Sequence, residues 1–382
     1  MTSDVALVGR DELRSLSLCE DTVRSVPFLE AMASGNNDSL SSLVCNVRTT
    51  TKLVRIGSHV LPVTVNETEY ENAWVCSPYN AAVTYPLEEL RHLPSLALRR
   101  ALAGMLHTVA PILRAACINR VVCVNNWLLS TNLYLEIDRS QIEQLTMMLK
   151  DLFPRHAILF RSLNVATNNQ LMASLQQTGY QFAPSRQVYL YDGRQPGYLE
   201  RPNCKRDLRL LAETTHFTPV SHGGIDDFER VQELYDLLYL HKYSFHNPQF
   251  TSRLMRIWHD SKMMSLFGLA NCGGRLDGVV GTFVMNGVLT APLVGYDTLQ
   301  PQNLGLYRLL MAHVLRQAAE ERLMLNLSAG AASFKRLRGG QGELEYSAVY
   351  CRHLPTRQRV AWTALAKLLK GIGGPVLRRY EL

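Results

Sequence analysis

The sequence has few of the features that mark secreted or membrane proteins. Its eight cysteines are scattered, and no two of them are spaced Cys-x-x-Cys. A disulfide framework and a zinc site are therefore not expected, and the thiols are expected to stay reduced in the cytosol. There is no run of eighteen apolar residues, so no membrane span is expected. The charged N-terminal residues have no apolar core behind them, so we expect no signal peptide and a cytoplasmic protein.

Familiar catalytic signatures are also missing. The sequence shows no Walker loop, no Rossmann fingerprint and no sign of a Ser-His-Asp triad. It also shows no His-Glu-x-x-His motif, and it therefore predicts no metal centre. What is present is a globular composition, with 47% hydrophobic and 19% charged residues in a chain of 382. That length favours two domains over one core.

The net charge of +7 is concentrated at one end of the chain. Residues 335–382 hold ten Lys and Arg against three Glu, and the charges of the preceding residues balance. A cluster of this kind favours a partner rich in phosphate, such as tRNA. A solvated basic helix explains it equally well.

The most informative pattern lies between residues 288 and 345. An apolar strand at 288–296 leads through the turn Gln302-Asn303-Leu304-Gly305 into an amphipathic helix at 306–322. A second strand, at 323–327, is followed by small residues. A strand, a glycine-bearing turn and a helix direct backbone N–H groups and the positive helix end at an anion.

Further elements surround this pattern. Asn286-Gly287 is a strong signal for a type I′ hairpin between two strands. The periodicity also predicts helices at 226–243 and 248–259, strands at 264–270 and 276–285, a short helix near Phe334, a strand around 346–351, and a basic amphipathic helix at 355–370.

The first half of the chain is less regular. Residues 1–45 are poorly patterned, and Ser34–Ser42 is expected to be a loop. A first domain is predicted at 46–195 and a second at 200–382, divided near Asp192–Gly197. In the first domain we expect strands at 121–124, 133–137, 157–161 and 188–191, and helices at 140–152 and 168–177.

The element order of the second half resembles the GNAT acyltransferase superfamily. The first half looks like a degenerate copy, so the resemblance implies an α/β (α+β) fold with two tandem GNAT-like domains. Each would be a mixed, mostly antiparallel sheet flanked by helices. Tandem copies resemble Fem-type aminoacyltransferases and CelD/BcsL-like acetyltransferases, whose late Phe-Lys, glycine and acidic-aromatic sequence is similar to Phe334-Lys335, Gly339-Gly340 and Glu345-Tyr346.

The resemblance implies a donor site at the turn before residue 306. GNAT enzymes hold the pyrophosphate of coenzyme A on Gln/Arg-x-x-Gly-x-Gly/Ala, and Gln302 to Gly305 match its first four positions. Tyr307 replaces the final small residue, which crowds a close approach of the diphosphate and fits the Fem-type branch instead. The donor-binding residues predicted are Gln302, Asn303, Gly305, Tyr307, Arg308, Asn326 and Ser328; an ordinary strand-to-helix turn is the alternative.

Candidate catalytic residues follow from side-chain chemistry. Lys335 could hold a phosphate or the developing oxyanion, unless it is a plain surface lysine. His241 or His246 could act as general base, although helix-corner histidines are often structural. Tyr296 could hydrogen-bond the acyl carbonyl, and Glu345 could deprotonate an ammonium or simply offset nearby arginines. The polar strand ends 125–132, 161–164 and 185–187 could build an acceptor pocket or only satisfy loops.

Three functions remain open from the sequence. The first is an N-acyltransferase that moves an acyl group from acyl-CoA to an amine, or a hydroxyl, of a small molecule. The second keeps the reaction but takes aminoacyl-tRNA as donor, bound through the basic C-terminal region. The third is a non-catalytic GNAT-like binding module.

Overall fold

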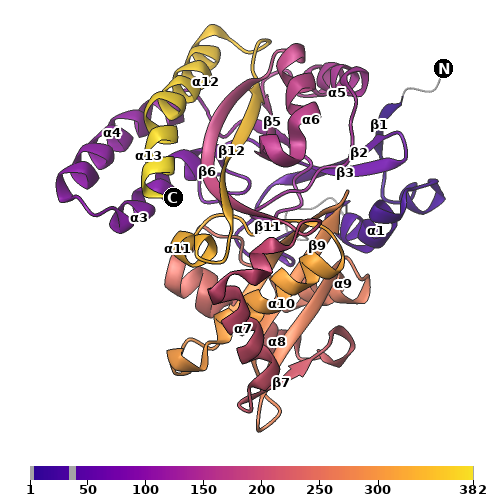
Figure 1. Cartoon of the computed structure of the whole chain (residues 1–382). Helices are drawn as coiled ribbons and strands as arrows, with labels where there is room; N and C mark the ends of the chain where they lie inside the picture. The colour runs from indigo at the N-terminus through magenta and orange to yellow at the C-terminus, as the bar shows by residue number, and fades with distance from the viewer. Residues whose placement is uncertain (1–3, 34–39, 382) are drawn as a thin grey trace. The chain divides into compact units, whose positions relative to one another are not determined.

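The structure, a computed structural model, describes residues 4–33 and 40–381 (Figure 1). Packing of the Cα atoms divides the chain into two compact units. Unit 1 holds the described parts of 1–187 and 344–382 together with 246–248, and unit 2 holds 188–245 and 249–343. The units interleave along the chain. The division predicted near Asp192–Gly197, between domains at 46–195 and 200–382, is linear and stays a prediction.

Unit 2 contains the region with the informative sequence pattern. Its strands lie in the order β6-β11-β10-β9-β8-β7, and neighbours are antiparallel except for β10 and β11. The strands are β7 (Phe217–Val220), β8 (Met264–Asn271), β9 (Leu276–Met285), β10 (Val288–Tyr296) and β11 (Met324–Asn326), with the end of β6 (Gln181–Asp192). The helices are α7 (Pro202–Glu213), α8 (Phe228–Asp236), α9 (Ser252–Asp260), α10 (Leu306–Glu320) and α11 (Ala332–Arg336).

Unit 1 has the strand order β1-β2-β3-β4-β5-β12-β6, with β4 and β5 parallel. The strands are β1 (Val5–Val8), β2 (Thr50–Ile56), β3 (His59–Asn66), β4 (Val121–Val124) and β5 (Ala157–Leu163), with most of β12 (Gln341–Tyr350). The helices are α1 (Glu20–Ala33), α3 (Tyr85–Glu89), α4 (Leu96–Ala115), α5 (Arg139–Leu152), α6 (Val165–Thr178), α12 (Thr356–Leu368) and α13 (Gly374–Tyr380).

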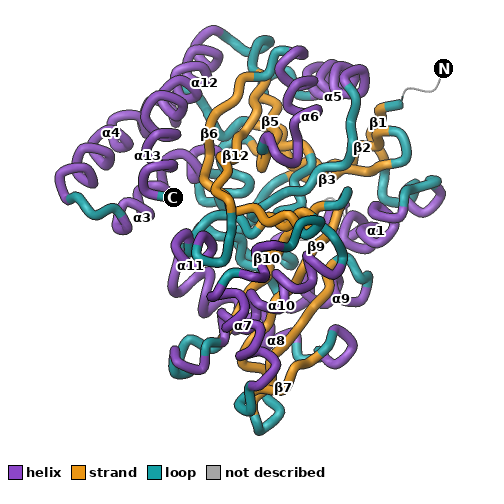
Figure 2. Tube along the Cα trace, viewed as in Figure 1, coloured by secondary structure: helices purple, strands orange, loops and turns teal. Residues whose placement is uncertain are grey.

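The two units repeat one arrangement. In each, an antiparallel run of strands ends in a parallel pair, β4 with β5 and β10 with β11, joined through a single helix. In each, the second strand of that pair has an antiparallel neighbour on its far side. Figure 2 shows the strands in orange with helices beside them. The predicted fold class, a mixed and mostly antiparallel sheet flanked by helices in two tandem copies, is confirmed.

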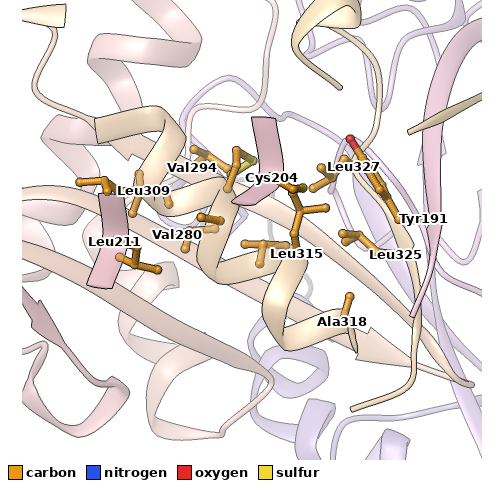
Figure 3. Close-up of a cluster of buried hydrophobic side chains, with 14 of the residues drawn as sticks. Tyr191, Cys204, Leu211, Val280, Val294, Leu309, Leu315, Ala318, Leu325 and Leu327 are labelled. Atoms are coloured by element: carbon orange, nitrogen blue, oxygen red, sulfur yellow. The ribbon is translucent and has the colours of Figure 1, made fainter. Parts of the chain in front are cut away.

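A continuous apolar cluster fixes α10 in unit 2 (Figure 3). Leu309 and Leu315 of α10 pack with Val280 of β9 and Leu325 of β11, and α7 adds Leu211. Complete burial of each such leucine contributes roughly 1.5–3 kcal/mol. The cluster therefore holds the axis of α10, and with it the position of the helix N-terminus.

Several local predictions can be checked against this fold. The Asn286-Gly287 hairpin is confirmed, since both residues have positive φ (48° and 71°) and Met285 pairs with Val288. The helix predicted at 226–243 is α8 followed by a wider, π-helical turn at Leu237–Tyr243. The segment 1–45 contains β1 and α1, which its weak pattern did not reveal. Most of the loop predicted at Ser34–Ser42 lies outside the described residues.

The strand predicted at 133–137 is wrong. The segment is buried except for Glu136, and it belongs to no ladder. Side chains bond it instead: the Nδ2 of Asn125 donates to the carbonyl of Leu133 at 2.7 Å, and the hydroxyl of Tyr134 donates to the carbonyl of Arg161 at 2.5 Å. The apolar pattern of this segment indicates burial, and the segment is buried here without pairing as a strand.

Helix α4 of unit 1 is largely exposed. Among the residues that the structure describes, it is the helix long and apolar enough to cross a bilayer, and 11% of its most apolar window is buried. Length and composition do not separate a span from a surface helix. The expectation of no membrane span therefore stays a prediction.

One half-buried histidine, His313, is expected to make the stability of unit 2 depend on pH. The ring of His313 on α10 stacks on Phe267 at 3.7 Å between centroids, and burial, aided by the charge of Arg316, lowers its pKa from 6.5 to about 4. Between these values the unfolded chain binds a proton that the folded chain refuses, so stability falls as the pH falls from 6.5 toward 4.

The expected loss is about 3 kcal/mol, since one pKa unit is worth about 1.4 kcal/mol. Urea unfolding of the wild type and of His313→Gln at about pH 7 and about pH 4 measures this loss. The variant should lose less stability than the wild type over this range. An equal loss in both would show that His313 is not responsible.

Candidate functional site

The parallel strands β10 and β11 separate after three paired residues. Val288 to Thr290 pair with Met324 to Asn326, and β11 ends there while β10 continues to Tyr296. Opposite β9, the register of β10 shifts between Thr290 and Leu293, which makes a bulge at Ala291 and Pro292. The parallel pairing therefore stops at Thr290 and Asn326, and the backbone that follows β11 is bonded instead to Tyr189 of β6.

The end of β11 is shaped by a tight turn. Asn326, which is buried, accepts the N–H of Ser328 at 2.9 Å through its side-chain oxygen. Ser328, Gly330 and Ala331 all have positive φ, of 58°, 78° and 49°. Positive φ in non-glycine residues costs free energy and is often found at functional sites. Asn326 and Ser328, both predicted site residues, thus shape the turn that follows β11.

Lys335 holds this turn closed. Its ammonium is buried and donates to the carbonyls of Leu327, Ser328 and Ala329 at 2.7, 3.2 and 2.8 Å. Three protein acceptors use the three donors of an ammonium group. The catalytic role predicted for Lys335 remains a prediction, and the contact that the structure gives is a structural one.

The turn into α10 has the geometry of an anion site. Gln302 and Asn303 are exposed, and Gly305 adopts φ 70°, from which the helix starts at Leu306. A Cβ at residue 305 would lie 3.1 Å from the side chain of Leu210. The first N–H groups of a helix have no intrahelical partner and carry the positive end of its dipole.

Arg308, in the first turn of α10, belongs to a network that the sequence did not reveal. The carboxylate of Asp207 on α7, 2% exposed, accepts from Arg308 at 2.7 Å and from Arg338 at 2.5–2.6 Å. Two guanidinium groups on one carboxylate leave one positive charge beside the helix N-terminus. In the sequence, Asp207 lies 101 and 131 residues from these two arginines. Its neighbours in the chain include Lys and Arg, which predict a solvent-exposed helix face instead.

The side chain of Tyr307 turns into an aromatic cluster. Its ring centroid lies 4.8 Å from Phe334 and 6.1 Å from Tyr296. Burial raises the pKa of its phenol well above the ordinary value. Tyr296, predicted to contact the acyl carbonyl, lies at the end of β10, where the Nζ of Lys242 donates to its hydroxyl at 3.2 Å. The structure therefore brings the rings of Tyr296 and Tyr307 together.

The two predicted histidines belong to different units. His241 is exposed in unit 2 and lies edge-on to Phe245 at 5.7 Å. His246 belongs to unit 1, where its carbonyl accepts from the N–H of Trp74 at 3.0 Å and its Nε2 lies 3.6 Å from Glu88. Neither role as general base is tested by these contacts.

Glu345, also in unit 1, is 2% exposed and bound by the guanidinium of Arg186 through both carboxylate oxygens, at 2.8 and 2.9 Å. The sequence offered offsetting of arginines as its alternative role. The ion pair with Arg186 is that contact.

A further acidic group in unit 2 was missed. Burial raises the pKa of Asp236 from 3.8 to about 6, although Gln232 and His241 act in the opposite direction. Asp236 ends α8 where the π-helical turn begins, and such turns are frequent at functional sites. Its only sequence signal was a carboxylate inside the otherwise apolar and aromatic stretch of residues 234–240. Across residues 4–33 and 40–381 no three His, Cys, Asp or Glu side chains gather as a metal site requires.

The strand pair, the glycine turn and the helix that follows it lie in a region that also matches a known protein family. The protein-family model for the acetyltransferase (GNAT) domain matches residues 200–336, from the start of α7 to the end of α11. The resemblance to the GNAT superfamily is confirmed for this segment.

Several solved structures are similar to the chain. L-PGS from Bacillus licheniformis is 13% identical (TM-score 0.44, covering 60% of this chain and 78% of that one). FemX is 9% identical (TM-score 0.44, 59% and 79%). A tandem GNAT protein from the clavulanic acid biosynthesis pathway is 10% identical (TM-score 0.38, 92% and 99%). No curated protein matches. At these scores, the likenesses carry no argument about donor or acceptor.

Proposed function

We propose that unit 2 transfers an acyl group from a coenzyme A thioester to an amine of a small acceptor. The observation that carries the proposal is the opening of β10 and β11 at the bulge, directly before the turn of Gly305. In this arrangement an extended donor would lie beside the separated strands, with the helix N-terminus at its phosphate end.

The residues present fit the phosphate end of such a donor. The first N–H groups of α10 supply donors, and Arg308 with Arg338 leaves one positive charge after Asp207 is neutralised. Oxygens of a diphosphate are stabilised by this combination. Coenzyme A would supply the activated carbonyl as its thioester.

The remaining chemistry is mainly positioning. The amine nitrogen forms a bond to the carbonyl carbon, the carbon–sulfur bond breaks, and the thiolate leaves. The amine loses a proton to a base, for which Asp236, with its raised pKa, and His241 are the candidates in unit 2. Backbone donors at the opened strands would stabilise the developing oxyanion. We also propose a cytoplasmic location, in keeping with scattered cysteines.

Aminoacyl-tRNA is the second candidate donor. Tyr307 favours it, because its bulky ring lies against Phe334 and Tyr296 where coenzyme A sites carry a small residue. The basic residues of 335–382 offer charge for a phosphate backbone. A salt-sensitive interaction is the expected signature of this donor.

Calorimetric titration with acetyl-CoA, a longer acyl-CoA and charged bulk tRNA, at low and moderate salt, tests both donors. We expect micromolar acyl-CoA binding that Gly305→Val weakens by at least about tenfold, because a β-branched residue is strained at φ 70° and meets Leu210. Tyr307→Ala should change affinity in the opposite sense, since it opens the turn.

Gly223→Val is the matched control, because a Cβ at residue 223 meets no atom within 4 Å. It should bind like the wild type, and the melting temperature of each variant separates lost binding from lost folding. Salt-sensitive tRNA binding without acyl-CoA binding would select the second donor. If the wild type binds neither, the acyltransferase proposal is wrong.

A further inference from the structure

Unit 1 has its own opened strand pair, and its chemistry differs from that of unit 2. Strands β4 and β5 pair in parallel from Val121 to Val124 and then separate, as β10 and β11 do. In unit 2 the first residues past the pair are small or apolar. In unit 1 they include Asn126 and Arg161, both buried.

Arg161 is a buried cation without a carboxylate of its own. Arg161 is 6% exposed, and its Nη1 donates to the side-chain oxygen of Asn126 at 3.2 Å. Its Nη2 is buried and has no hydrogen-bond partner. Burial lowers the pKa of the guanidinium. A charged group in such a position is normally paired, because desolvation is costly.

The carboxylate near Arg161, that of Glu345, is already paired with another arginine. Glu345 accepts two hydrogen bonds from Arg186, whose Nη2 also donates to the carbonyl of Ser130 at 2.6 Å. Arg161, Arg186 and Glu345 therefore carry one positive charge in excess. The thiols of Cys76 and Cys123 do not offset it, because burial raises their pKa values to about 12 and about 11.

An indole covers both guanidinium groups. The guanidinium carbons of Arg161 and Arg186 lie 4.8 and 5.2 Å from the ring centroid of Trp74, which is only half-buried. Next to Arg161, Ser162 has φ 63° inside a strand, and its buried hydroxyl has no partner. Backbone strain and unsatisfied polar groups at one place are common where a ligand binds.

We propose that unit 1 binds a small molecule that carries a carboxylate group. An oxygen of this carboxylate accepts a hydrogen bond from the Nη2 of Arg161, next to the ring of Trp74. A carboxylate is planar and matches the guanidinium edge. Its single negative charge balances the single excess positive charge, whereas a phosphate dianion would overshoot it. The site does not depend on acyl transfer by unit 2.

Tryptophan fluorescence and thermal unfolding of the full chain test the site, with acetate, benzoate and inorganic phosphate as probes. We expect the carboxylates at millimolar concentration to change the fluorescence and raise the melting temperature, and phosphate to do neither. Arg161→Met should lose carboxylate binding by at least about tenfold. Without ligand it should melt above the wild type, because an uncompensated buried charge is gone.

Three further variants test whether binding depends on the guanidinium of Arg161. Arg155→Met removes an exposed arginine just before β5 and should bind like the wild type. Trp74→Phe should lose the fluorescence response and keep the thermal response. Arg161→Lys keeps the charge without the planar edge, should bind weakly, and replaces Arg161→Met if that variant does not fold.

Three results would overturn the proposal. The first is a wild type that responds to none of the carboxylates. The second is an Arg161→Met variant that folds but melts below the wild type while its response to carboxylates is unchanged, which would make Arg161 purely structural. The third is binding of phosphate with equal affinity, which would make the site one for any anion and contradict the charge argument.

Discussion

Gly193→Ala is expected to lower the free energy of unfolding by about 3 kcal/mol or more. A Cβ on Gly193 would lie 1.9 Å from the carbonyl oxygen of Ala318 and 2.4 Å from that of Leu323. Both are backbone atoms, so no side-chain rotation relieves the overlap. The N–H of Gly193 also donates to Leu323 at 2.8 Å, which ties the end of β6 to the start of β11. Denaturant unfolding measures the loss.

Gly197→Ala is the control from the same loop. A Cβ at residue 197 meets nothing within 4 Å, so the variant should unfold within about 0.5 kcal/mol of the wild type. Equal stability of the two variants would mean that α10 and β11 do not approach Gly193 as closely as the structure shows.

Asp207→Ala should destabilise the protein by about 3–5 kcal/mol. The carboxylate is 2% exposed and holds Arg308 and Arg338 together. Its removal leaves the nearly buried guanidinium of Arg338 without a counter-ion. Because Arg308 lies in the first turn of α10, donor affinity should change as well. Chemical unfolding and acyl-CoA titration of the same variant report the two effects.

Glu200→Gln provides the comparison with an exposed ion pair. Glu200 and Lys205 contact each other at 2.5 Å, with 74% and 60% of their side chains exposed. Exposed pairs contribute about 0–1 kcal/mol, so this variant should be nearly as stable as the wild type. A loss for Asp207→Ala no larger than this would contradict a buried role for Asp207.

Much of unit 2 could be predicted because its signals are local. Asn286 tolerates positive φ through its short polar side chain, and Gly287 does so because it has no Cβ. The hairpin between β9 and β10 therefore follows from two residues. The glycine at 305 likewise marks the start of α10 wherever the helix packs. The domain order and the GNAT resemblance rest on such signals in series.

Unit 1 was predicted less well because its signals compete with burial. Leu133 to Ile137 have a strand pattern, yet Asn125 and Tyr134 satisfy this stretch through side chains. The strand β1 and helix α1 were missed because four residues and a weak apolar stripe are too little for a periodicity argument.

Of the candidate site, the sequence by itself determined the chemical inventory and the local turns: the glycine at 305, the small residues after β11, and the lysine, histidines and carboxylates available. Tertiary structure alone decided how these groups are used. In the folded chain Lys335 donates to three backbone carbonyls and Glu345 pairs with Arg186. Asp207 forms ion pairs with Arg308 and Arg338. The physical reason is that a turn is set by the φ preference of adjacent residues, whereas the partner of a buried charge is set by packing between segments far apart in the chain.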